Sequence, residues 1–173
     1  MKKLIVFTFM SILIFSCKQE VVENEFSSCC SEPEKNITVG VGKVFISNLY
    51  TPDYNGVNDL FVIYTNSDIK KLNHLEIKDK NGNLLYSNDT NSTNVMVWNS
   101  KKGTEFWYGK LSYKFQAEDK NGLTNWIEGT ACSYSCKLDS LYKSTFDKNN
   151  CVTPSQFDGV QFDKAISNGE DCF

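Results

Sequence analysis

Between residues 37 and 131, short apolar runs alternate with clusters of glycine, asparagine and aspartate. In the segment 74–79, Leu75 and Ile77 alternate with polar residues, and 110–119 repeats this pattern, as expected for strands with one solvated face. Runs of this kind at this spacing predict an all-β fold, an antiparallel immunoglobulin-like β-sandwich over 37–131. The expected strands are 37–50, 60–64, 74–79, 83–87, 95–98, 110–119 and 124–131.

Glycine positions indicate where the chain turns. The tetrapeptide Asp-Lys-Asn-Gly occurs at 79–82 and again at 119–122, each time between two predicted strands. Asn-Gly supplies the left-handed backbone of tight turns, so both copies predict a hairpin. Within 37–50, Gly40 and Gly42 predict bulges or points of close backbone approach inside a strand.

The hydrophobic pattern changes after residue 131. Apolar residues at helical spacing predict a short helix over 137–146. A second helix is predicted over 153–169, with Pro154 near its start and Gly169 as its stop. The segment 132–173 is therefore expected to be a partly helical extension packed on the sandwich.

The N-terminus has the features of an export signal. Two lysines precede an apolar run of about twelve residues, 4–15, which is too short to span a bilayer of roughly 30 Å. The segment 13–17 resembles the lipobox of bacterial lipoproteins, which predicts removal of 1–16 and lipidation of Cys17. The alternative is a plain signal peptide with an incidental cysteine.

The segment 17–36 is polar, acidic and poor in large apolar residues, so it is expected to be a flexible tether. The charged stretch that begins it, Lys18, Gln19 and Glu20, resembles a surface-export signal and favours display outside the outer membrane. A solvated spacer facing the periplasm is the alternative.

The charge of the chain excludes some partners. All 18 basic residues are lysines; without the signal peptide 16 remain against 21 acidic residues, a net charge of −5. Binding to phosphate backbones favours a positive face and bidentate guanidinium groups, so we expect no nucleic-acid partner. An anionic membrane surface would not attract the chain either, so the lipid is the expected membrane anchor.

Six cysteines remain after Cys17. An even number in an exported protein favours disulfides, but the sequence does not choose among the pairings. A bond between adjacent cysteines is strained, so Cys29 and Cys30 are expected to reach partners elsewhere and to pin the tether to the domain. A zinc site is the alternative, although the spacings do not resemble a zinc knuckle or ribbon. The disulfide candidates are Cys29, Cys30, Cys132, Cys136, Cys151 and Cys172.

The polar segment 51–59, Thr-Pro-Asp-Tyr-Asn-Gly-Val-Asn-Asp, lies between two apolar runs. Asp53, Asn55, Asn58 and Asp59 offer the oxygen ligands that calcium prefers, although the segment lacks the frame of an EF-hand. The alternative is a turn in which aspartate and asparagine side chains bond their own backbone. No other cofactor is expected.

The sequence shows no catalytic constellation. His74 is the only histidine, and no nucleophile elbow or zinc-protease motif accompanies it. Aromatic residues concentrate in the last predicted strands, and those left on the surface would suit stacking on sugars or docking a partner, whereas the others would fill the core. The stacking candidates are Trp98, Trp107, Tyr108 and Trp126.

The segment 44–63 resembles the opening of the gliding-motility-associated C-terminal domain of Bacteroidetes. Residues 51–52 and 56–61 match its Thr-Pro and Gly-x-Asn-Asp positions, while 77–86 and 108–113 resemble its later strands more loosely. The resemblance covers about 43–131 and implies a sandwich fold in a Bacteroidetes protein. In that family the domain ends large secreted proteins and serves in type IX secretion sorting, whereas here about forty residues follow it.

These observations predict a lipid-anchored outer-membrane protein, periplasmic or surface-exposed, that binds or assembles and does not catalyse. Its partner would be a protein or glycan at the cell surface, and its role adhesion or an accessory function in surface or secretion assembly. Two alternatives stay open: a carbohydrate-binding lipoprotein of a nutrient-uptake system, and a hydrolase that acts on glycans.

Overall fold

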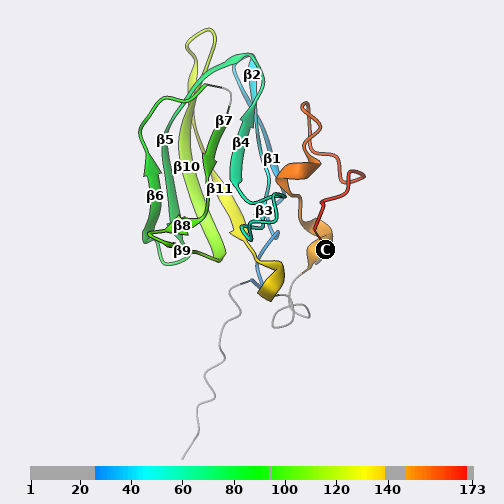
Figure 1. Cartoon of the computed structure of the whole chain (residues 1–173). Coiled ribbons are helices and arrows are strands. Elements are labelled where there is room, and N and C mark those ends of the chain that lie inside the picture. The colour runs from blue at the N-terminus through cyan, green and yellow to red at the C-terminus, as the bar shows by residue number, and fades with distance from the viewer. Residues whose placement is uncertain (1–25, 94, 139–146, 171–173) are drawn as a thin grey trace, which may run out of the picture.

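The computed structural model describes residues 26–93, 95–138 and 147–170, which form a sandwich of two β-sheets (Figure 1). These residues contain no α-helix and only three short 3₁₀ turns, which confirms the all-β prediction. Within the same ranges, no helix has the length and apolar character needed to cross a membrane. The predicted signal peptide and lipidation site, Cys17, lie outside the described residues.

One sheet has the spatial order β1-β2-β4-β7 and is antiparallel throughout. The run 37–50 was predicted as one strand, and this prediction is wrong: it contributes to the hairpin β1–β2 and to the short strand β3. Gly40 explains the difference, because its backbone adopts φ +57° and reverses the chain. The strands are β1 (Lys35–Val39), β2 (Gly42–Ile46), β4 (Phe61–Thr65) and β7 (Val95–Trp98).

The second sheet has the spatial order β3-β11-β10-β5-β6. Its long strands pair antiparallel, and the short β3 pairs parallel with β11. The remaining predicted strands each overlap an observed one, although β5 begins five residues earlier than expected. The strands are β3 (Leu49–Tyr50), β5 (Ile69–Asp79), β6 (Leu84–Asn88), β10 (Gly109–Asp119) and β11 (Thr124–Ser133), with a separate hairpin of β8 (Lys101–Lys102) and β9 (Glu105–Phe106).

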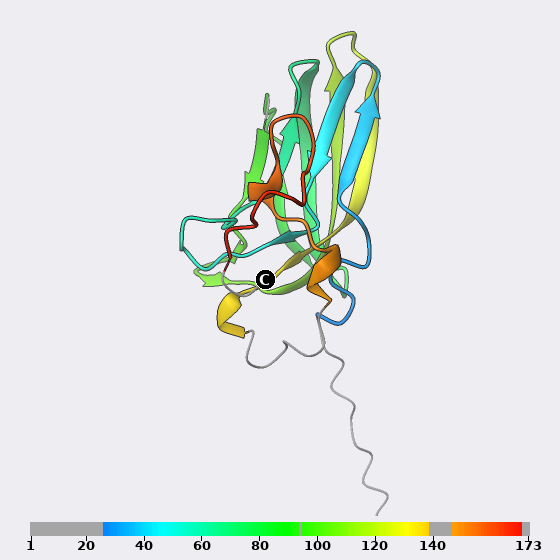
Figure 2. The same cartoon turned by 90° about the vertical axis from the view of Figure 1, so that its right-hand side faces the viewer.

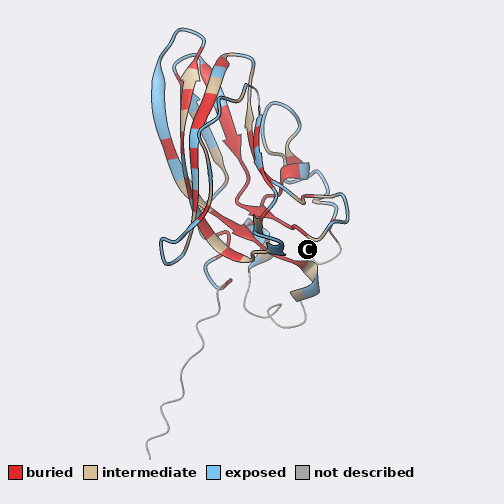
Figure 3. Ribbon diagram, turned by 60° about the vertical axis from the view of Figure 1, so that its left-hand side comes forward, coloured by how far each residue is buried: buried red, intermediate tan, exposed pale blue. Residues whose placement is uncertain are grey.

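The main core lies between the two sheets. Alternate strand positions supply its side chains, and Phe61 of β4 and Phe115 of β10 are completely buried. Figure 3 shows the resulting alternation of buried and exposed positions along the strands of the five-stranded sheet. Each buried side chain of this size contributes about 1.5–3 kcal/mol to folding. The alternate side chains of the same strands point away from this core.

Both Asp-Lys-Asn-Gly segments form hairpin turns, as predicted. Asp79 Oδ1 accepts hydrogen bonds from the N–H groups of Asn81 (2.8 Å) and Asn83 (2.9 Å) between β5 and β6. Asp119 Oδ1 does the same at the corresponding positions between β10 and β11 (2.9 and 2.8 Å). The terminal glycines have φ of +82° and +87°. The aspartates therefore fix both turns from inside.

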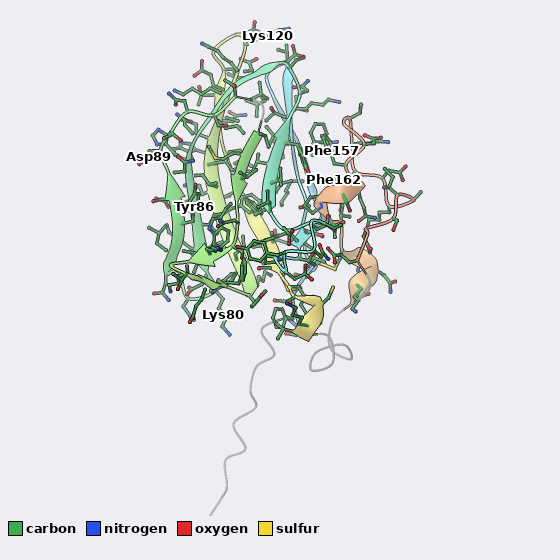
Figure 4. All side chains as sticks on the ribbon, in the orientation of Figure 1. Lys80, Tyr86, Asp89, Lys120, Phe157 and Phe162 are labelled. Atoms are coloured by element: carbon green, nitrogen blue, oxygen red, sulfur yellow. A yellow bond between two sulfur atoms is a disulfide. The ribbon has the colours of Figure 1, made fainter. Side chains whose placement is uncertain are left out.

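The C-terminal extension packs across the outer face of the four-stranded sheet (Figure 2). Phe157 stacks on Tyr64 of β4, with ring centroids 4.5 Å apart, and contacts Phe45 of β2 at 5.0 Å. Phe162 packs on Phe157 at 5.5 Å, and Figure 4 shows both rings on this side of the sandwich. The extension thus occupies this face and leaves the outer face of the five-stranded sheet open.

The helix predicted over 153–169 is wrong. Only Pro154–Gln156 forms a 3₁₀ turn. Beyond it, Asp158 Oδ1 accepts hydrogen bonds from the N–H groups of Val160 (2.7 Å) and Gln161 (2.8 Å), which replace helical bonds with a local turn. The helix predicted over 137–146 overlaps a 3₁₀ turn, Cys136–Leu138, and its remainder lies outside the described residues.

Two disulfides join the N-terminal segment to distant parts of the chain, which confirms the prediction that the adjacent cysteines pair elsewhere. Cys29 bonds to Cys132 at the end of β11, and Cys30 bonds to Cys151 in the extension. Cys136 is also disulfide-bonded, and Cys172 lies outside the described residues.

The flexible tether was predicted to reach residue 36, which is too far. Phe26 is only 3% exposed and packs edge-on against Tyr134, with ring centroids 5.1 Å apart. Together with the disulfide sulfurs it belongs to a second, smaller core at the base of the sandwich. The described part of this segment is therefore a component of the fold.

Candidate functional site

The open face of the five-stranded sheet is hollowed. Two hollows of about 520 and 360 Å³ share Glu76 of β5 and Lys114 of β10, so they form one continuous surface that we call the outer groove. Glu76 lies between buried Leu75 and Ile77, and this alternation directs its side chain away from the core. Figure 4 shows Asp89, at the rim of the groove, on the side of the sandwich away from the extension.

Trp126 of β11 lines the outer groove with 55% of its surface exposed. The ammonium of Lys114 lies 5.2 Å from the centroid of its indole ring. The His74 ring lies 6.0 Å away, centroid to centroid, with the two planes inclined by 32°. An exposed indole beside a cation and an imidazole is the kind of aromatic platform that binding sites use.

His74 has a strained backbone. Its φ of +53° lies in the left-handed region, which costs a residue with a Cβ about 1–2 kcal/mol. The strain arises at a β-bulge, where Phe115 of β10 faces two residues of β5, His74 and Leu75. The bulge places His74 on the outer face, where its Nδ1 lies 3.1 Å from Asp89 Oδ1.

His74 belongs to no motif in the sequence, but the spacing of its neighbours in the strand indicates its position. Leu72 and Leu75 are both fully buried, yet they are three residues apart, which regular alternation does not allow. Such a spacing within one strand predicts a bulge between the two leucines. It does not predict which side chain the bulge directs outward, or what that side chain meets.

Acidic and basic side chains alternate across the outer groove. In register, Lys114 of β10 lies opposite Glu76 of β5 on one side and opposite Glu128 of β11 on the other. The Glu76 carboxylate also pairs with the Lys78 ammonium at 2.7 Å. The larger hollow is lined by equal numbers of the two charges: Glu32, Glu76 and Glu128 with Lys35, Lys78 and Lys114.

The larger hollow is also lined by Tyr113, whose buried hydroxyl has no hydrogen-bond partner among the described residues. The hydroxyl passes over Gly129 of β11, where a Cβ would lie only 2.5 Å away. Burial, and then the Glu32 carboxylate, hold the pKa of Tyr113 well above its usual value, so it stays a neutral phenol. The ring of Tyr113 belongs to the main core, and its hydroxyl is closed off from solvent beneath the hollow.

The other three stacking candidates are not exposed platforms. The prediction that Trp98 could stack on a ligand is wrong. Trp98 is 3% exposed and packs in the main core, because it lies opposite Phe61 on the inner face of its sheet. Trp107 and Tyr108 are half-buried, the first against the main core and the second against the smaller one. Of the four, Trp126 has by far the most exposed side chain.

The segment 51–59 forms the connection between β3 and β4. Asp59 Oδ1 accepts hydrogen bonds from the N–H groups of Asp53 (3.0 Å) and Tyr54 (2.6 Å), and its Oδ2 accepts from Gly56 (2.9 Å). The other three calcium candidates also each accept from a backbone N–H: Asp53 Oδ1 from Asn55, Asn55 Oδ1 from Val57 and Asn58 Oδ1 from Ser155. This is the geometry of the turn alternative.

Glu170 joins the extension to this turn. It is 6% exposed and accepts hydrogen bonds from Asn55 Nδ2 (3.0 Å), Asn58 Nδ2 (3.2 Å) and the Thr51 hydroxyl. A carboxylate oxygen of Glu170, a carboxylate oxygen of Asp53 and the sulfur of Cys136 also lie within 4.8 Å of one another. Because Cys136 is disulfide-bonded, it is not a thiolate ligand, and only two carboxylates are left.

We expect calcium not to stabilise the protein. An ion held by Asp53, Asn55, Asn58 and Asp59 would have to compete with backbone hydrogen bonds that each of these side chains already accepts. The measurement is thermal melting of the mature chain in EDTA and in millimolar calcium, with magnesium as the control. A calcium-specific rise in melting temperature of several degrees would contradict the turn interpretation.

Comparisons with known proteins add little. No family model matches the chain, and no curated protein matches it. A solved structure, that of CopC from Methylosinus trichosporium OB3b, aligns over 59% of this chain and 94% of its own, with 9% identity and a TM-score of 0.37. We infer neither a ligand nor a function from a similarity of this degree. The relationship to the gliding-motility-associated domain stays a prediction.

Proposed function

We propose that this protein is a lipid-anchored, non-catalytic binding module of the bacterial cell envelope that holds its ligand in the outer groove. Disulfides form and persist outside the cytoplasm, so Cys29–Cys132 and Cys30–Cys151 fit an extracytoplasmic location. The lipobox-like segment at 13–17 supports anchoring through Cys17. The anchor would hold the sandwich at the outer membrane, facing the periplasm or the cell surface.

One observation carries the binding role: an exposed Trp126 lies beside a His74 held in a strained backbone. Leaving a tryptophan exposed forgoes the stabilisation of burial, and the left-handed histidine costs folding energy. A structural role for this face would need neither. The acid common to both hollows, Glu76, is paired with Lys78, which favours binding over acid–base chemistry.

The proposal is tested by sedimentation of the unlipidated chain, with Cys17→Ser, together with cell envelopes of its host. We expect this chain to sediment with the envelopes and Trp126→Ala to abolish most of that binding. The matched control is Leu123→Ala, which removes another exposed apolar side chain from the same hairpin but outside the groove. Equal sedimentation of the Trp126→Ala chain and its parent would refute the groove as the binding site.

A matched pair at His74 tests separately whether its ring contributes to binding and whether its backbone is strained. Both His74→Gly and His74→Ala remove the ring, so both should weaken envelope binding. Glycine adopts φ +53° without the steric penalty, so His74→Gly should be the more stable of the two by about 1 kcal/mol in urea unfolding. Equal stability of the two variants would show that the backbone at this position carries no strain.

A further inference from the structure

We infer that the ligand of the outer groove is a neutral oligosaccharide; this inference rests on the proposed function and specifies its ligand class. The groove combines a hydrophobic platform at one end with closely spaced charged and hydroxyl-bearing groups along its length. The charge, hydrogen-bonding groups and shape of the groove each restrict the class of ligand that it can bind.

The charge balance excludes strongly charged ligands. The larger hollow has equal numbers of carboxylates and ammonium groups, and Lys114 lies between two glutamates in register. A polyanion would meet Glu76 and Glu128 wherever it met Lys114, and a polycation would meet the lysines. Nucleic acid is excluded on the same ground, because single-strand grooves combine aromatic platforms with an excess of positive charge.

The polar groups match hydroxyls. A sugar hydroxyl both donates and accepts a hydrogen bond, so it can donate to a carboxylate such as Glu128 and accept from a neighbouring ammonium such as Lys114. A purely apolar ligand would remove water from these charged groups without offering them any hydrogen bond in return.

The platform matches the apolar face of a sugar ring. Trp126 exposes 55% of its surface, and a pyranose presents axial C–H groups on one face and hydroxyls around its edge. A ring stacked on the indole would direct its hydroxyls toward His74, Asp89 and Glu76, which line the same hollow. The two adjoining hollows, of about 520 and 360 Å³, have room for several consecutive sugar residues.

The first experiment measures binding of the unlipidated chain to neutral hexasaccharides, namely cellohexaose, maltohexaose, xylohexaose and chitohexaose, by calorimetry. Hexagalacturonic acid and an acidic peptide of similar length serve as charged probes. We expect at least one neutral hexasaccharide to bind at least tenfold more tightly than both charged probes. Trp126→Ala should weaken that binding at least tenfold, whereas Leu123→Ala should leave it unchanged.

The second experiment identifies the ligand class on host envelopes. Periodate cleaves the vicinal diols of sugars, and a protease removes exposed protein. If the ligand is a glycan, protease should leave the Trp126-dependent sedimentation, and periodate should abolish it where the sugar residues carry vicinal diols, as in 1→4-linked glucans and xylans. If protease abolishes it and periodate does not, the ligand is a protein and the saccharide inference is overturned, although the groove remains the binding site. Loss of the Trp126 dependence itself would instead refute the proposed function.

Discussion

Removing both described disulfides is expected to leave the protein largely unfolded, whereas removing either one should cost only about 3 kcal/mol. Cys29–Cys132 closes a loop of 103 residues and Cys30–Cys151 one of 121 residues. Because Cys29 and Cys30 are adjacent, the presence of either bond shortens the loop that the other closes to about 20 residues. The two bonds therefore share roughly a third of their effect on the unfolded chain.

The measurement is urea unfolding under non-reducing conditions of Cys29→Ser/Cys132→Ser, Cys30→Ser/Cys151→Ser and the fourfold variant. Each pair serves as the control for the other, since the two should lose similar stability. The second removal should cost more than the first, about 4–5 kcal/mol, because it releases a loop of more than 100 residues. Equal and additive losses would show that the bonds act through separate parts of the fold.

Gly40→Ala is expected to lower the melting temperature at least twice as much as Gly82→Ala. Both glycines have positive φ, +57° and +82°, so alanine strains the backbone in each case by about 1–2 kcal/mol. At Gly82 nothing lies within 4 Å of the added Cβ, so strain is the whole effect. At Gly40 the Cβ would lie 2.1 Å from Asp119 Oδ2, which must move.

Moving Asp119 should destabilise the fold further, because this residue joins the two sheets. Its Oδ2 accepts a hydrogen bond from the Val41 N–H in the β1–β2 turn (3.1 Å), and its Oδ1 holds the turn between β10 and β11. Burial acts to raise the pKa of Asp119, but the N–H groups that surround it outweigh burial and lower the pKa. Melting curves at neutral pH would measure the difference; equal losses for the two alanine variants would remove this role from Asp119.

The turns at Asp-Lys-Asn-Gly and at Gly40 also show which turns a local sequence pattern can predict. Asp-Lys-Asn-Gly predicted both of its hairpins, because the aspartate and glycine of each segment form the turn with their own neighbours. Gly40 was placed inside a strand, because Val39 and Val41 continue the apolar run on both sides of it. Only the Asp119 carboxylate, 78 residues from Val41, accepts the N–H group that the turn presents.

The difference between local and long-range contacts also separates the two candidate sites, the segment 51–59 and the outer groove. The segment 51–59 looked like a ligand shell in sequence because it concentrates oxygen atoms. Its own backbone and Glu170, more than a hundred residues away, take up those oxygens and the amide N–H groups. The outer groove had no such concentration, since His74, Lys114 and Trp126 are spread over three strands.

Local patterns in the chain were enough to predict the all-β class, most of the strands, both Asp-Lys-Asn-Gly hairpins and the bonding of the adjacent cysteines to distant partners, because each depends on alternation, turn chemistry or covalent geometry between near neighbours. Contacts between distant segments established which cysteines bond, which tryptophan is exposed and which face the extension covers. Those outcomes depend on strand register and sheet packing, in which one residue of displacement moves a side chain from the core to the solvent. The outer groove belongs to this second group.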